Sequence, residues 1–147
     1  MDHKTILRHS LATMAFRTTH VLKSYKENYS EFTPCNDVMT PLRIINHMQM
    51  MMHYVDTVFR ETTFEREEFP NLDDAFRNLL NNLQKLDKTI ESLVTIDEDK
   101  ILSMFQGPIL DAMTHVGQLA TLRRLSGDPI EGVKYHQAEI ISGKFDY

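Results

Sequence analysis

Apolar side chains recur every three or four residues along four long segments of the chain, and this spacing predicts four amphipathic α-helices. The segments span residues 4–28, 41–62, 72–93 and 106–126, and the five prolines lie outside them or in their first turns. Thr40 and Pro41 form a good start for the second helix, because the threonine hydroxyl can cap free amides and proline loses no hydrogen bond at the first helical position.

The connections between the segments are less regular. Residues 28–37 form a loop, residues 97–100 form a solvated connection, and residues 101–105 suit either a short strand or a helical turn. The fourth helix is expected to begin at Gly107-Pro108 and to end at Ser126-Gly127-Asp128-Pro129. Residues 130–147 read as an irregular tail with one short helix around residues 135–141. We therefore predict an all-α fold, a single domain over residues 1–147: an antiparallel four-helix bundle, with a crossover connection as a variant.

Composition and charge exclude several classes of function. The formal net charge is −5, whereas nucleic acids and anionic membranes attract basic surfaces, so neither partner is expected. No window approaches the roughly 18 apolar residues of a membrane span. Cys35 is the one cysteine and cannot form an intramolecular disulfide, and residues 1–9 do not resemble a secretory signal. These features predict a cytoplasmic protein.

Candidate chemistry lies in the fourth helix. Asp111 and His115 are four residues apart, which places them about 40° apart around the helix and about 6 Å apart along it. Asp111 follows Ile109 and Leu110, so we expect its carboxylate to be buried and to need a partner, since desolvating a lone charge is costly.

His47 lies on an apolar line of the second helix and is the expected third member of this site. His53 points about 120° away and cannot share it, and His3, His9, His20 and His136 suit the surface. Two imidazoles and one carboxylate from facing helices can hold Zn²⁺, Ni²⁺, Fe²⁺ or Mn²⁺ and leave positions open. A core histidine with a His–Asp or Asp–Arg pair is the structural alternative, and the residues alone leave both open.

Two segments resemble those of the DinB-like (YfiT-like) proteins. Residues 40–47 read Thr-Pro-Leu-Arg-Ile-Ile-Asn-His, and residues 114–127 contain a His, a Gly-Gln pair and an Arg before Gly. Pro129 and residues 135–143 are similar to the ending of that family, and the order is the same. The family is a four-helix bundle, commonly dimeric, with a divalent metal held by three histidines; His47 and His115 match two of them, and Asp111 stands where the third would be.

The resemblance implies a homodimer that binds a divalent metal and acts on a small-molecule substrate. Members of known activity include a maleylpyruvate isomerase and metal-dependent thiol transferases that use glutathione, mycothiol or bacillithiol. An enzyme of the thiol S-transferase kind would use the metal to lower the pKa of a low-molecular-weight thiol. Gln118 is placed to orient a ligand, although helix packing is its more common use, and Tyr54 is a weaker candidate for a pocket hydroxyl.

Two alternatives stay open. One is a non-enzymatic dimeric helical bundle in which His47, Asp111 and His115 form a vestigial or structural cluster; replacing a buried Asp111 by alanine would then destabilise the fold by a few kcal/mol. The other is an apolar groove or dimer face, because the methionines of the second helix wrap around it and cannot all face one core. These methionines are Met48, Met50, Met51 and Met52.

Overall fold

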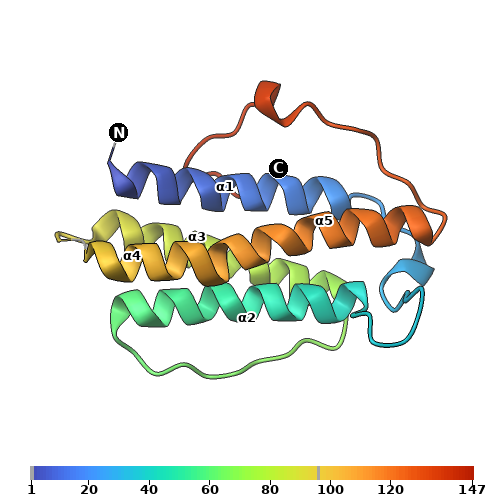
Figure 1. Ribbon diagram of the computed structural model, residues 1–147, viewed down its shortest axis with the longest axis horizontal. Coiled ribbons are helices and arrows are strands. Elements are labelled where there is room, and N and C mark those ends of the chain that lie inside the picture. The colour runs from blue at the N-terminus through green and yellow to red at the C-terminus, as the bar shows by residue number, and fades with distance from the viewer. Residues whose placement is uncertain (1, 96) are drawn as a thin grey trace.

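The computed structural model describes residues 2–95 and 97–147, and within them the fold is a four-helix bundle without strands, as the hydrophobic pattern predicts. Four helical rods pack side by side, and the C-terminal tail crosses one face of the bundle (Figure 1). The elements are α1 (His3–Leu22), η1 (Glu27–Tyr29), α2 (Pro41–Arg60), α3 (Leu72–Ser92), α4 (Glu98–Met104), α5 (Leu110–Leu125) and η3 (Tyr135–Gln137). No helix in the described part of the chain is both long enough and apolar enough to cross a membrane.

Each long rod starts at a side chain that accepts a hydrogen bond from a free backbone amide. Thr40, which directly precedes Pro41, accepts a hydrogen bond from the backbone N–H of Arg43, as expected from the sequence. The other caps belong to the residue types that prefer this position, because a short polar side chain can reach the first turn. They are Asp2, Asn71 and Asp97.

The rods run up, down, down and up along the chain, so α2 and α3 are parallel and a crossover connects them (Figure 1). Residues 61–71 return along the bundle to the end at which α2 begins. Side-chain hydrogen bonds agree with this direction. Gln49 contacts Asn82, and about two turns further along both helices Asp56 contacts Thr89. Of the two arrangements predicted, the bundle with a crossover connection is therefore confirmed.

A buried row of amides fixes both this crossover and the register of α2 against α3. Asn46 donates to the carbonyl of Phe69 at 2.9 Å and accepts from its N–H at 2.8 Å. Gln49 donates to the carbonyl of Glu67 at 2.6 Å, and Asn82 donates to the side-chain and main-chain oxygens of Gln49. Because buried amides left unpaired would be costly, this row allows few other positions for the crossover.

The fourth rod begins at Glu98, well before the predicted start at Gly107. Asp97 caps α4, so residues 97–100 are a helix start and not a solvated connection. The rod then widens into a π-helical turn, Phe105–Ile109, and continues as α5. Of the two alternatives for residues 101–105, the helical one is confirmed.

Proline explains why this join is a π-turn. Pro108 has no N–H to donate and its ring would collide with the preceding turn of a regular α-helix. Gly107 adopts φ −91° and ψ −107°, outside the helical region, and this lets the rod pass the proline without ending. The expectation that a helix begins at Gly107-Pro108 is therefore wrong, because Pro108 lies inside a continuous helical rod.

Arg123 joins the ends of α1 and α5. Its buried guanidinium donates to the carbonyls of Val21 and Lys23 at 2.7 and 2.8 Å, and to the carboxylate of Asp128 at 2.6 Å. These carbonyls belong to the C-terminal end of α1, where helices leave acceptors free. Helix α1 ends at Leu22 and not near residue 28. The guanidinium of Arg123 supplies hydrogen-bond donors that the backbone N–H groups of a further helical turn would otherwise have supplied.

The chain after α1 contributes to the same buried junction. The Tyr29 hydroxyl donates to the carbonyl of Leu119 at 2.8 Å, and burial raises the pKa of Tyr29. Burial by itself would also raise the pKa of Asp128. The backbone N–H of Lys26 and the guanidinium of Arg123 outweigh that effect and together lower the pKa of Asp128.

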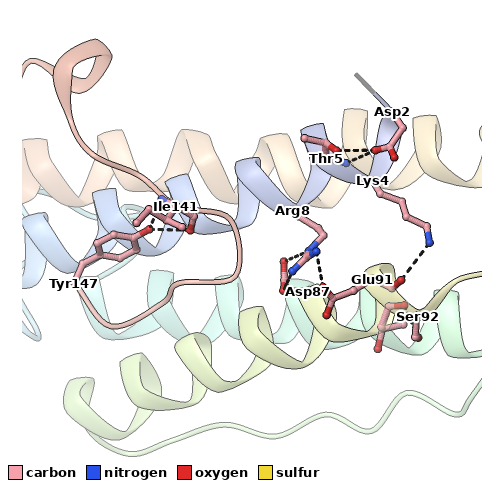
Figure 2. A network of polar contacts seen from close by, with 10 residues as sticks. Asp2, Lys4, Thr5, Arg8, Asp87, Glu91, Ser92, Ile141 and Tyr147 are labelled. Carbon is pink, nitrogen blue, oxygen red and sulfur yellow. Dashed lines mark hydrogen bonds and ion pairs between the residues drawn. The ribbon is translucent and has the colours of Figure 1, made fainter.

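An ion-pair group ties α1 to α3 (Figure 2). Arg8 donates to both carboxylate oxygens of Asp87, at 2.8 and 2.9 Å, and to Glu91 at 2.7 Å. The C-terminal tail passes close to this group at Gly143, which has φ +86°. A Cβ atom there would lie 3.3 Å from Nη2 of Arg8, so this position favours glycine for both space and backbone conformation.

The tail from residue 130 is irregular, as predicted, and it packs along α1. Phe145 is buried, and the ring of Tyr147 meets Phe16 edge-on at 5.2 Å. Arg17 lies over the ring of Tyr135 at 4.2 Å. The short helix expected at residues 135–141 is a single 3₁₀ turn, because aromatic contacts with α1 hold this segment in place of helical hydrogen bonds.

Asp128→Asn should lower the free energy of unfolding by about 2–3 kcal/mol at pH 7, because it leaves the buried Arg123 without its counter-charge. The folded-state pKa of Asp128 is below its ordinary value, so its stabilisation is complete above about pH 4 and is lost as the pH falls further. Urea unfolding should show a smaller difference in the free energy of unfolding between Asp128→Asn and wild type at pH 3 than at pH 7. Asp146→Asn in the exposed tail is the control. An equal loss of stability in that variant would contradict the stabilising role of the pair formed by Asp128 and Arg123.

Candidate metal centre

Helices α2 and α5 run antiparallel beside each other and bring the three predicted residues together (Figure 1). His47 comes from α2, where its neighbour Met48 is fully buried. Asp111 and His115 come from α5, one turn apart, beside the buried Ala112. Each of the three therefore lies at the edge of a buried stripe, where a side chain can face a neighbouring helix and still approach solvent.

The distances suit three donors on one ion. Nε2 of His47 and Nε2 of His115 each lie 3.5 Å from Oδ2 of Asp111. The two imidazole rings are perpendicular, with centroids 5.0 Å apart, and one donor atom from each residue falls within 4.8 Å of the others. Donors at about 2.0–2.2 Å from a zinc ion lie roughly 3–4 Å from one another, so small side-chain movements would complete such a site.

The three side chains differ in burial. The side chain of His115 is 8 % exposed, that of His47 is 41 % exposed, and that of Asp111 is 53 % exposed. The expectation that Asp111 is buried is therefore wrong. Its preceding neighbour Leu110 is itself 43 % exposed, so an apolar neighbour in the sequence did not indicate the core here. The cluster is open to solvent on its Asp111 side, and a fully buried polar network is contradicted.

Gln118 orients the buried imidazole of His115. Its side-chain oxygen lies 2.7 Å from Nδ1 of His115 and can only accept a hydrogen bond, so Nδ1 carries the proton. Nε2 then presents a free lone pair toward Asp111 and His47. Histidine ligands in metal sites are commonly oriented by an acceptor on the other ring nitrogen, which is the arrangement found here.

The remaining histidines stay outside this cluster, as predicted. His3, His9 and His136 are exposed, and His20 bonds the carbonyl of Glu131 at 2.9 Å. His53 packs against Phe64 on the crossover, with ring centroids 5.4 Å apart. In the part of the chain that the structure describes, His47, Asp111 and His115 are the one group of such side chains close enough to share an ion.

The methionines of α2 differ in burial, and Met51 packs partly buried against the core that contains Met48 and Met52. Met48 and Met52 are fully buried, whereas Met50 and Met51 are half-buried. Tyr54, the candidate pocket hydroxyl, is 43 % exposed and its ring meets Phe64 edge-on at 5.9 Å. The prediction that the four methionines cannot share one core is confirmed.

A pocket of about 710 Å³ lies beside the cluster, between α2, α5 and the loop before α2. It touches the cluster through Gln118, which bonds His115, and through Thr114, the residue before it. The lining residues are Pro34, Asp37, Val38, Met39, Ile44, Thr114, Gly117, Gln118, Thr121, Leu122 and Leu125. The sequence carried no signal for this pocket, because its two halves are far apart along the chain.

Comparisons with protein-family models, with curated proteins and with solved structures find no match to this chain. The resemblance to DinB-like proteins therefore stays a prediction. The geometry stands without it: two imidazoles and one carboxylate meet at one point beside a pocket, and they can hold a metal ion.

The exposure of Asp111 changes what its removal should do to the metal-free fold. Asp111→Ala should alter the free energy of unfolding by less than about 1 kcal/mol, because an exposed charge pair contributes little. Urea unfolding in the presence of a chelator measures this directly. A loss of several kcal/mol would restore the interpretation of the cluster as a structural network.

Proposed function

We propose that this protein binds one divalent cation through His47, Asp111 and His115 and acts on a small molecule held in the adjacent pocket. The donor set supports binding, since it joins two imidazoles to one carboxylate and leaves coordination positions free. The exposure on the Asp111 side supports access, because solvent or a substrate can reach the donors from there. The pocket supports a ligand of ordinary metabolite size.

The hydrogen bond between Gln118 and His115 carries the proposal. A histidine that served only to pack the core could donate from either nitrogen. Here Nδ1 of His115 donates to Gln118, and Nε2, which has the free lone pair, lies near a carboxylate oxygen of Asp111 and the imidazole of His47. That arrangement directs the free lone pair of His115 toward the carboxylate of Asp111 and the ring of His47, and a cation between the three side chains would bind all of them.

The donor set accommodates Zn²⁺, Ni²⁺, Fe²⁺ or Mn²⁺. When bound, such an ion would supply Lewis acidity and lower the pKa of a coordinated water or thiol. The protein side chains would do the rest: His47 and His115 hold the site at the helix interface, Asp111 lowers its net charge, and Gln118 keeps the His115 ring in place.

The resemblance to DinB-like proteins extends the proposal to an enzyme of the thiol S-transferase kind with a low-molecular-weight thiol as cofactor. It also suggests a homodimer. The order of the matching segments, residues 40–47 and then 114–127, supports this assignment because they hold His47 and His115. Asp111 in place of a histidine would make the donor set harder and more suited to oxygen-preferring ions.

Untagged protein should bind about one divalent cation per chain, and His47→Ala or His115→Ala should abolish binding while the helical fold is retained. Elemental analysis after dialysis against Zn²⁺, Ni²⁺, Fe²⁺ or Mn²⁺ gives the stoichiometry, and circular dichroism reports the fold. His53→Ala on the same helix is the matched control. The proposal would be overturned if wild type takes up no metal, or if His53→Ala loses as much bound metal as His47→Ala.

Gln118→Met should weaken cation binding by about 10–100-fold, because it keeps the length of the side chain but removes the acceptor that orients His115. Gln118→Glu keeps an acceptor and should bind at least as well as wild type. Zn²⁺ titration calorimetry compares the three proteins. Equal affinities in the wild type and Gln118→Met would assign Gln118 to packing alone.

A further inference from the structure

The pocket beside the candidate metal centre carries one charge, and that charge is negative. Asp37 lines it from the loop before α2, and its side chain is exposed. Among the residues that the structure describes, no lysine, arginine or histidine lines the pocket. A ligand rich in carboxylates would therefore find no cationic side chain on the pocket wall and would face the carboxylate of Asp37.

The uncharged polar groups of the pocket are mostly acceptors. The Thr114 hydroxyl donates to the carbonyl of Asp111 at 2.7 Å, and the Thr121 hydroxyl donates to the carbonyl of Gly117 at 3.0 Å. Each hydroxyl has thus used its proton and keeps lone pairs for a ligand. Gln118 is the exception, since His115 occupies its oxygen and its amide N–H groups stay available as donors.

Apolar side chains form the remainder of the wall. They come from the loop before α2, from the start of α2 and from the last turns of α5. The apolar lining consists of Pro34, Val38, Met39, Ile44, Leu122 and Leu125. An apolar body gains free energy by leaving water for such a surface.

We infer that this pocket takes a compact apolar molecule that carries a protonated amine, and that it disfavours carboxylate-bearing thiols such as glutathione. The inference rests on the proposed function, because it names the substrate class of the same site. The apolar wall receives the body of the molecule, and Asp37 with the threonine oxygens receives the N–H groups. The amide of Gln118 can donate to an oxygen of the same molecule next to His115.

Gly117 offers a way to narrow the pocket without disturbing the fold. It lies in α5 and lines the pocket, and a Cβ atom added there would meet nothing within 4 Å. Leucine forms helices better than glycine does, so Gly117→Leu should fold at least as well as wild type. Gly117→Ala adds little volume and is the matched control.

The probes are 2-phenylethylamine and 3-phenylpropanoate, which share a body and differ in charge. They are titrated by NMR into chelator-treated protein, so that no cation attracts either probe. The amine should bind about fivefold more tightly than the carboxylate, as an exposed charge pair allows. Asp37→Asn should remove most of that preference, and asparagine tolerates the φ of +65° at this position. Asp146→Asn, with the same change in net charge, should keep it.

Gly117→Leu should weaken the binding of both probes, because its side chain narrows the pocket, and Gly117→Ala should bind them about as tightly as wild type. A carboxylate that binds as tightly as the amine, an Asp146→Asn variant that behaves like Asp37→Asn, or a Gly117→Leu variant that binds both probes as tightly as wild type would each overturn the inference. Glutathione at the same concentrations should leave the Gly117 resonance unmoved, and a clear shift would also overturn it. Metal uptake is measured separately on the same proteins, so its failure would count against the proposed function alone.

Discussion

The rotation of α2 about its own axis is the constraint on which the rest of the structure depends. Asn46 and Gln49 face α3 and the crossover, and their amides are held there by backbone groups of Phe69 and Glu67. Successive helical residues point about 100° apart, so holding Asn46 in this direction turns the next residue, His47, toward α5. One row of buried amides therefore sets the crossover, the packing of α2 on α3 and one side of the candidate metal centre.

The other side of the centre depends on α5, which is held at both of its ends. The π-turn at Phe105–Ile109 joins α5 to α4 in one rod, and Arg123 anchors its last turn to α1 through main-chain carbonyls and Asp128. Between these anchors, Asp111 and His115 have little freedom to shift along the rod. The cluster thus combines well-anchored main-chain positions with an exposed carboxylate, an arrangement that could hold a metal ion within reach of solvent.

Sequence periodicity predicted the helices best where local rules act without competition. The limits of α2 and α3 agree with the prediction within two residues, since Thr40 and Asn71 cap free amides at their starts. It failed at the end of α1 and at the start of the fourth rod. Interactions that local sequence rules do not describe set these two helix limits. Arg123 donates to carbonyls at the end of α1, and a π-helical turn accommodates Pro108 within the fourth rod. The identities of the three candidate ligands could be read from spacing and type, but the burial of Asp111 could not.

By itself, the sequence determined that the chain is all-helical, that it forms four rods, and that His47, Asp111 and His115 are of a kind to bind metal, because these properties follow from spacing along a helix and from side-chain chemistry. Only the tertiary structure decided that α2 and α3 run parallel, that Asp111 faces solvent, that Gln118 orients His115, and that Asp37 joins Thr121 in one pocket. These properties depend on which faces of distant segments meet, and the packing of the whole bundle settles that.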